Sequence, residues 1–383
     1  MRTLLSGNEA IAEAVRLARV PFVAAYPITP QTPIYEKLSG LENEGRLPGT
    51  MMRTESEHSA MAACVAASLT GVRTFTATAS QGLALMHEML HFASGNRVPV
   101  VMANVNRVLA VPWAFGSDQT DSLSQRDTGW LQLYCEDGQE ALDTVLQAYR
   151  IAEQVMLPVM VCIDGFFTSH FIEPLEIPDQ AAVDAFLPPP SIPNRFDIQN
   201  PAYISNVVSP AQFRRFRQRS FEDMEKARPL IQAVDEEYRQ GFGRGYGLVE
   251  AVETEDAEIV LVTSGAMTGT ARVAVRALRD QGVRVGLLKI KAFRPFPREE
   301  VQAALQGVPK AAVVDRNISI GKEGIFCQEL KAALYPLERR PQITGYIAGL
   351  CGDDVSPETL EEMVRGTLRS DQPPPGPIWV RKD

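Results

Sequence analysis

The regular alternation of helix patterns and apolar strand patterns over the first part of the chain constrains its fold most strongly. In chain order the patterns cover 8–19 (helix), 22–28 (strand), 55–69 (helix), 73–79 (strand), 83–93 (helix), 98–105 (strand), 139–154 (helix) and 157–163 (strand). Strands that are apolar throughout are typical of parallel sheets, because crossover helices bury both faces of such sheets. The alternation therefore predicts a parallel sheet covered by helices on both faces.

A change of character after Phe186 separates this unit from a second one. The stretch LPPPSIPNRFDIQNP is too rich in proline for a sheet and predicts an extended arm. A polar helix follows at 209–239, and Pro229 predicts a break in it. Alternation then resumes at Glu258, through EIVLVTSG, TARVAVRALRDQG, VRVGLLKI, REEVQAALQG and AAVVDR. We expect an α/β protein with two parallel-sheet domains, at 1–182 and 251–383, joined by an arm and helical segment at 183–250.

Composition excludes several classes of protein. The net charge of -9 argues against a nucleic-acid binder, since phosphate backbones attract a basic face. The five cysteines are scattered without a CxxC spacing, which predicts no iron–sulfur cluster or structural zinc on this chain and fits a reducing cytoplasm. No apolar run reaches roughly 18 residues, so we expect no membrane span, and the N-terminus lacks the apolar core of a signal peptide.

Distinctive polar loops follow several of the predicted strands, and ligands of parallel sheets bind beyond the carboxyl ends of strands. These loops are YPITPQTP at 26–33, SQG at 80–82, NVNR at 104–107, and GSDQTD at 116–121 leading into RDTGW. A further segment, TESE at 54–57, opens a predicted helix. We take these segments as the candidate ligand site.

The ordered set of motifs resembles a known family. YPITPQTP, TESEHSAMAA, FTATASQGLALM, and RDTGW with EDGQEALD resemble the pyruvate:ferredoxin oxidoreductase family, and specifically the alpha subunit of its multi-subunit members. LKIKAFRPFP and VVDRNISIG resemble the family's second domain, so the resemblance covers nearly the whole chain. It implies a pyrimidine-binding domain at 1–182 and a transketolase C-terminal-like domain at 251–383.

The resemblance also implies an activity and a set of partners. Such enzymes use thiamine diphosphate to decarboxylate a 2-oxo acid, pass electrons to iron–sulfur clusters and transfer the acyl group to coenzyme A. This chain would hold the aminopyrimidine, while a beta-type subunit would bind the pyrophosphate and magnesium, and gamma- and delta-type subunits would carry the clusters. The chain lacks the GDG-then-asparagine motif for magnesium pyrophosphate and lacks clustered cysteines, in agreement with that division.

Glu57 is the first candidate for a catalytic role. The resemblance aligns it with the family's carboxyl group at the pyrimidine ring, which favours the imino tautomer of a cofactor that itself serves as the electron sink. The alternative is structural, because Thr54 and Glu57 match a T-x-x-E capping box at a helix start. The resemblance favours the catalytic role, and we expect Glu55 to be solvated.

Thr29 and Arg107 are the candidate substrate ligands. The resemblance implies that the Thr29 hydroxyl donates to the 2-oxo acid and that Arg107 grips its carboxylate through a charge-assisted contact. Their alternative roles are turn chemistry beside two prolines for Thr29 and a surface or interface ion pair for Arg107. The remaining cofactor-binding candidates are Pro27, Ile28, Ser80 and Gln81.

A different function is suggested by His87 and His91, which with Glu88 satisfy the HExxH pattern of zinc peptidases. The apolar neighbours are typical of a packed helix: Leu83, Leu85, Met86, Leu90 and Phe92. The other histidines, His58 and His170, do not have the spacing of a third zinc ligand. We expect a packed helix and no metal on this chain, and we keep a zinc peptidase and a non-catalytic assembly subunit as alternative functions.

One segment departs from the family pattern and leaves the substrate open. Pyruvate-type alpha subunits typically show a run of tryptophan, aspartate and histidine where this chain has PWAFGSDQ at 112–119. Branched or aryl 2-oxo acids, phenylglyoxylate among them, are therefore expected alongside pyruvate. The electron acceptor, ferredoxin or NAD, would be recognised by other chains.

Overall fold

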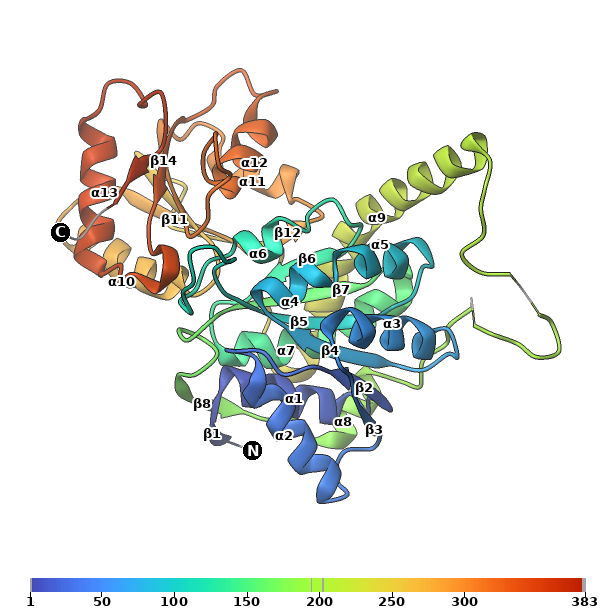
Figure 1. The fold of residues 1–383 in the computed structure, drawn as a ribbon. Helices are drawn as coiled ribbons and strands as arrows, with labels where there is room; N and C mark the ends of the chain where they lie inside the picture. The colour runs from blue at the N-terminus through green and yellow to red at the C-terminus, as the bar shows by residue number, and fades with distance from the viewer. Residues whose placement is uncertain (1, 194, 202, 381–383) are drawn as a thin grey trace.

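The computed structural model of the chain describes residues 2–193, 195–201 and 203–380, which form two large sheets with helices on both faces of each (Figure 1). Within these ranges the first sheet has seven strands in the order β12-β6-β7-β5-β4-β2-β3. Their bounds are β2 (Phe22–Ala25), β3 (Thr50–Arg53), β4 (Thr74–Thr78), β5 (Val101–Asn106), β6 (Leu131–Tyr134), β7 (Val159–Asp164) and β12 (Ala292–Arg294). All pair in parallel except β12.

Two helical layers bury this sheet, as the alternation predicted. One layer contains α1 (Gly7–Leu17), α2 (Thr32–Asn43) and α7 (Gly138–Val155). The other contains α3 (Glu57–Ser68), α4 (Ser80–Leu85) and α5 (His87–Gly95), with the short α6 (Thr120–Leu123) beside α4. Every residue of β4, β5, β6 and β7 is buried, because neither face of a central strand reaches solvent.

The second sheet repeats this architecture on a smaller scale. In the described part of the chain its order is β15-β14-β13-β10-β11-β9. The strands are β9 (Val249–Val252), β10 (Ile259–Thr263), β11 (Val285–Ile290), β13 (Lys310–Asp315), β14 (Gln342–Ile347) and β15 (Ile378–Trp379). Helices α10 (Met267–Asp280) and α13 (Pro357–Arg369) cover one face, and α11 (Arg298–Leu305) and α12 (Ile325–Leu334) cover the other. The expected α/β fold with two parallel sheets is confirmed.

Each sheet carries one antiparallel edge strand that the sequence patterns did not predict. Strand β9 pairs antiparallel with β11, and β12 leaves the second unit to pair antiparallel with β6 of the first sheet. Edge strands have one unpaired side, so either direction is compatible with a parallel centre. A separate two-stranded antiparallel sheet joins β1 (Arg2–Ser6) to β8 (Ile172–Glu176), before the short α8 (Gln180–Phe186).

Helix α9 (Pro210–Phe242) runs without interruption through Pro229, so the predicted break is wrong. Proline removes one backbone hydrogen bond, and tertiary packing on both sides of it holds the helix together. Ala227 and Ile231 flank the proline and are buried in the core, where α9 packs on α7. The first turns of α9 project from the body of the molecule (Figure 1), and residues 211–219 are exposed. None of the described helices has the length and apolar character needed to cross a bilayer.

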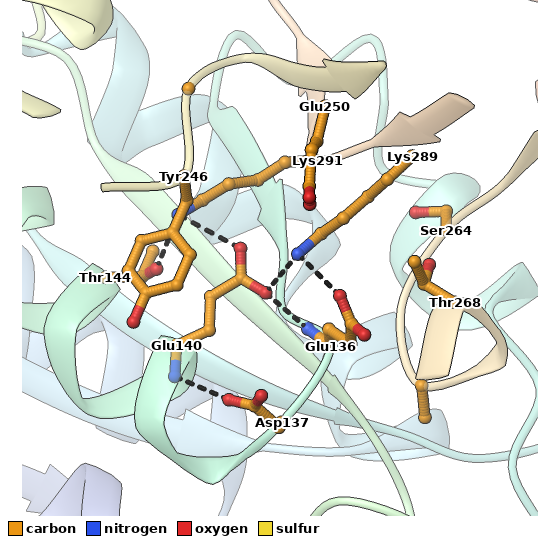
Figure 2. A network of polar contacts seen from close by, with 12 residues as sticks. Glu136, Asp137, Glu140, Thr144, Tyr246, Glu250, Ser264, Thr268, Lys289 and Lys291 are labelled. Carbon is orange, nitrogen blue, oxygen red and sulfur yellow. Dashed lines mark hydrogen bonds and ion pairs between the residues drawn. The ribbon is translucent and has the colours of Figure 1, made fainter. Parts of the chain in front are cut away.

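A buried cluster of charges joins the second sheet to the first (Figure 2). At the end of β11, Lys289 Nζ lies 2.6 Å from Glu140 Oε2 in the first turn of α7 and 3.0 Å from Glu136 Oε2 just before that helix. Lys291 Nζ lies 3.3 Å from Glu140 Oε1 and 4.4 Å from the centroid of the Tyr246 ring. Buried charges persist in proteins when they are paired, so these ion pairs help to set the orientation of the two sheets.

Candidate active site

The candidate loops converge at one edge of the first sheet. The order β5-β4-β2-β3 makes these four strands neighbours, and they run parallel. Thr29 follows β2, Glu57 follows β3 at the start of α3, Ser80 follows β4, and Arg107 follows β5. Parallel neighbours present their carboxyl ends at the same edge, which is where ligands bind in such sheets.

Glu57 stands in the first turn of α3, but it is not part of a capping box. The N-cap is Ser56, whose Oγ accepts a hydrogen bond from Ser59 N at 3.2 Å. The Thr54 hydroxyl instead donates to Ala25 O at 3.2 Å. The predicted capping box of Thr54 and Glu57 is therefore not formed. Its side chain is buried at the strand edge, and burial raises the pKa of its carboxyl group.

Gly82 lets the Glu57 carboxylate approach the backbone of α4. A Cβ atom at this position would lie 2.5 Å from Glu57 Oε1 and 2.5 Å from Thr78 Oγ1, closer than side-chain contacts allow. A larger residue would thus displace the carboxylate. The sequence marked SQG as a loop of the site, but it gave no signal that this glycine touches Glu57.

Arg107 and Thr29 come into direct contact, though not through the threonine hydroxyl. Arg107 Nη1 donates to the backbone carbonyl of Thr29 at 2.5 Å, and Nη2 donates to Gln81 Oε1 at 2.5 Å. Arg107 is only 3% exposed, and burial lowers its pKa while the Asp121 carboxylate opposes that shift. Because Arg107 is buried and both acceptors of its guanidinium are neutral, it forms no surface ion pair with the described residues. Two of its five N–H groups are used in these contacts.

The remaining cofactor-binding candidates lie around this pair. The backbone carbonyl of Ile28 accepts from Gln31 N at 2.8 Å, so the turn holds Ile28 half-buried, while Pro27 and Thr29 are exposed. Ser80 is fully buried, and its hydroxyl contacts Gln81 Oε1 at 2.5 Å. The structure thus brings together all of the residues that the sequence singled out at this edge.

Several buried polar atoms at this edge have no hydrogen-bond partner among the described residues. They are Thr78 Oγ1, Gln81 Nε2, Asn104 Oδ1, Asn106 Oδ1 and Arg107 Nε. A buried polar group without a partner costs about 1–3 kcal/mol. A polar ligand with donors and acceptors would satisfy such atoms, and the aminopyrimidine ring of thiamine diphosphate has both. Together with the Glu57 carboxyl group that lies against Gly82, these residues fit the aminopyrimidine ring.

Asp121 is a residue of this site to which the sequence assigned no role. It belonged to the GSDQTD loop, and it lies in α6, only 1% exposed. Its carboxylate accepts from the backbone N–H groups of Ser80 and Arg107, at 2.9 and 3.2 Å. A lone aspartate in a loop has no sequence signature of such contacts.

The loop at 108–119 is held by the second unit. A Cβ at Gly116 would overlap the carbonyl of Cys351, so the two backbones touch. Asp164, at the end of β7, accepts from Ser117 Oγ at 2.8 Å and from Ala266 N, which precedes α10, at 2.7 Å. In this loop the Phe115 ring lies 5.4 Å from the Arg107 guanidinium and remains exposed. The second unit therefore helps to shape the approach to Arg107.

The HExxH histidines are side by side on α5. The rings of His87 and His91 are 5.0 Å apart, and His87 Nδ1 lies 2.6 Å from Gln125 Oε1. Burial, with smaller effects of His87 and Arg217, lowers the pKa of His91. Over the ranges that the structure describes, no group of three or more His, Cys, Asp or Glu side chains could hold a metal ion.

The fold defines a class of two-domain α/β proteins. The structure is similar to 2-oxoglutarate:ferredoxin oxidoreductase from Magnetococcus marinus, solved with 2-oxoglutarate, coenzyme A and succinyl-CoA bound, with a TM-score of 0.73 and 21% identity, over 96% of this chain and 65% of that chain. It is also similar to a split-gene transketolase, with a TM-score of 0.58 and 13% identity, over 95% of this chain and 98% of that one.

Sequence comparison identifies the family within this class. Residues 13–236 match the thiamine diphosphate-binding domain of pyruvate flavodoxin/ferredoxin oxidoreductases, and residues 257–360 match the pyruvate:ferredoxin oxidoreductase core domain II. The chain is 45% identical to pyruvate synthase subunit PorA of Methanothermobacter thermautotrophicus, over 98% of this chain and 97% of that protein. It is 48% identical to ketoisovalerate oxidoreductase subunit VorA of Pyrococcus abyssi, over 92% and 90%.

The chain therefore belongs to the pyruvate flavodoxin/ferredoxin oxidoreductase family, and its N-terminal domain is a thiamine diphosphate-binding domain of that family. The resemblance recognised in the sequence motifs is confirmed. Family membership supports the oxidoreductase hypothesis and lends no support to the zinc peptidase.

Proposed function

We propose that this chain is the alpha-type subunit of a thiamine diphosphate-dependent, coenzyme A-acylating 2-oxo acid:acceptor oxidoreductase, and that it supplies the pyrimidine half of the cofactor site. The observation that carries the proposal is the buried Glu57 carboxyl group, held against Gly82 at the edge where Arg107 and Gln81 also meet. A buried carboxyl group with a raised pKa at such an edge is typical of functional sites.

The residues of this edge have distinct roles in the proposal. Thiamine diphosphate, when bound, supplies the nucleophile and electron sink for decarboxylation. Glu57 would hydrogen-bond the pyrimidine ring and favour its imino tautomer, while the backbone around Ile28 and Gln81 lines the ring. The unused N–H groups of Arg107 would bind the substrate carboxylate, and the exposed Thr29 hydroxyl would donate to the 2-oxo group.

The partners and substrates of the proposal follow from the division of the site. A beta-type subunit would complete the site with the pyrophosphate and magnesium, and gamma- and delta-type subunits would carry the iron–sulfur clusters. Relatives named for pyruvate and for ketoisovalerate are about equally similar to this chain, at 45% and 48% identity. The substrate is accordingly a small 2-oxo acid, either pyruvate or a branched or aryl homologue, and coenzyme A takes the acyl group.

Replacement of Glu57 by glutamine tests the central role. In the assembled complex, Glu57→Gln should reduce turnover on the order of 10²–10⁴-fold, the usual contribution of a proton-transferring group. Glu55→Gln is the matched control, because Glu55 is exposed and pairs with the Ser59 hydroxyl. Near-normal turnover of Glu57→Gln, with normal assembly, would reject the catalytic role and favour a non-catalytic assembly subunit.

The proposed division of the cofactor site between this chain and a beta-type subunit gives a second test. The chain purified alone should bind thiamine diphosphate and magnesium weakly or not at all in calorimetry, because half of the proposed site is on another subunit. The same titration of the assembled complex is the positive control. Tight binding by the single chain would contradict the division of the site.

A further inference from the structure

Asp121 connects the loop that carries Arg107 to the loop of Ser80 and Gln81. Its Oδ2 accepts from Ser80 N at 2.9 Å, from Asn104 Nδ2 at 3.1 Å and from Arg107 N at 3.2 Å. Its Oδ1 accepts from Asn106 Nδ2 at 2.7 Å and Ser122 N at 2.7 Å. Five N–H donors therefore surround one buried carboxylate, which is far more than capping the short α6 requires.

These contacts hold Arg107 at its backbone and, through Gln81, at its guanidinium group. Directly, Asp121 holds the backbone N–H of Arg107. Indirectly, it holds the N–H of Ser80, a residue with a left-handed φ of +51° at the start of α4. The next residue, Gln81, accepts from Arg107 Nη2. A left-handed conformation is unfavourable for a residue with a Cβ, so the hydrogen bond from Ser80 N to the carboxylate helps to hold this turn.

We propose that Asp121 is a positioning residue, which as a carboxylate holds Ser80, Gln81 and Arg107 in the arrangement that binds the carboxylate of the 2-oxo acid. The inference rests on the proposed function, since it acts through Arg107. An ionised carboxylate only accepts hydrogen bonds, so it can face all five donors without directing a hydrogen atom of its own at any of them. A protonated or amide group would direct its own hydrogen atoms at one of them and push that loop away.

The ionisation of Asp121 falls close to neutral pH. Burial raises its pKa to about 6, although hydrogen bonds from Ser80, Asn104 and Asn106 oppose the shift. The titratable groups that face it are Arg107, Tyr134 on β6 and Cys162 on β7. Burial raises the pKa of both Tyr134 and Cys162 well above their ordinary values, so these groups stay neutral around pH 6 while Arg107 stays charged. Asp121 is therefore the group of this cluster that titrates in that window.

The test replaces Asp121 by asparagine in the complete complex and measures steady-state kinetics with the 2-oxo acid and with coenzyme A. Displacement of a substrate-binding group by about 1 Å can cost roughly 10²-fold. We expect kcat/KM for the oxo acid to fall by about 10- to 100-fold, mainly through KM, and the KM for coenzyme A to change less than about threefold. In the natural enzyme, kcat/KM for the oxo acid should decrease as the pH is lowered through about 6. The Asp121→Asn enzyme should not show this decrease.

Asp315→Asn is the matched control. Asp315 is also buried, accepts from Phe326 N, Cys327 N and Asn317 Nδ2, and has a pKa that burial raises to about 6. It lies at the end of β13 in the second sheet, so its substitution should lower thermal stability but leave the KM for the oxo acid unchanged. An equal increase in that KM for both variants would overturn the inference, because it would reflect general destabilisation.

Arg107→Ala separates the failure of this inference from the failure of the proposed function. If Arg107→Ala leaves the oxo-acid kinetics unchanged, the proposed substrate site is wrong and the role of Asp121 with it. If Arg107→Ala raises KM but Asp121→Asn does not, only the assignment of Asp121 fails. Should Asp121→Asn fail to assemble, the pH profile of the natural enzyme decides, since a flat profile of kcat/KM through pH 6 would overturn the inference.

Discussion

Removal of the Glu140 carboxylate should destabilise the junction between the two sheets strongly. Glu140 is 1% exposed and lies within 2.6 Å of Lys289 Nζ and 3.3 Å of Lys291 Nζ (Figure 2). After Glu140→Gln, Lys289 keeps Glu136 as a partner. Among the described residues, Lys291 would keep only the Thr144 hydroxyl, at 2.9 Å, and the Tyr246 ring. One buried ammonium group thus loses its carboxylate.

The magnitude follows from this uncompensated charge. Removing one partner of a buried ion pair costs about 3–5 kcal/mol, because the remaining charge stays out of water. Burial alone would raise the pKa of Glu140, but the ammonium groups of Lys291 and Lys289 outweigh it and hold that pKa below its ordinary value. A lowered folded pKa means that this stabilisation is present above the unfolded value of about 4.3 and is lost as the pH falls through the folded pKa.

Urea unfolding of the full chain at pH 7 and at acidic pH measures this effect. The matched control is Glu250→Gln, since Glu250 pairs with Arg272 next to the junction but within the second unit, and its side chain is 41% exposed. Water screens such a pair, so its loss should cost less than about 1 kcal/mol. If Glu140→Gln costs as little as Glu250→Gln at pH 7, or if the difference from the natural chain persists unchanged in acid, the reasoning is refuted.

Three further substitutions address the active-site edge in the assembled complex. Gly82→Ala should lower turnover by about tenfold or more, because its Cβ would lie 2.5 Å from Glu57 Oε1; Gly95→Ala, with open space around the new Cβ, should not. Arg107→Lys keeps the charge but loses the planar fork, so the oxo-acid KM should rise by about tenfold, and an unchanged KM would remove Arg107 from the substrate site. Thr29→Val removes the hydroxyl but keeps the carbonyl that Arg107 binds, so a higher oxo-acid KM with normal assembly is expected, and identical kinetics would leave Thr29 as a turn residue.

Much of the fold could be predicted from local sequence patterns. The apolar runs 98–105 and 157–163 contain the central strands β5 and β7. A strand that is buried on both faces is apolar along most of its length, so the sequence shows it directly. The short motifs around Thr29 and Glu57 likewise identified the family before any contact was known. Their place at one edge followed from the rule that neighbouring parallel strands end together.

Where these local signals failed, tertiary packing determined the structure. Pro229 predicted a break in α9, but the burial of Ala227 and Ile231 on either side of it outweighs one lost hydrogen bond. Strand β12 has three residues, too few to show a period, and its direction is set by its partner β6 in the other domain.

The inner contacts of the site were decided by tertiary structure as well. Arg107 meets the carbonyl of Thr29 across 78 positions of sequence, and Asp121 meets Ser80 across 41. The sequence by itself determined which chemical groups come to the edge of the sheet, because local periodicity sets the strand ends. Only the folded chain determined which of those groups touch, because hydrogen bonds and the missing Cβ of Gly82 depend on positions in space that no local pattern records.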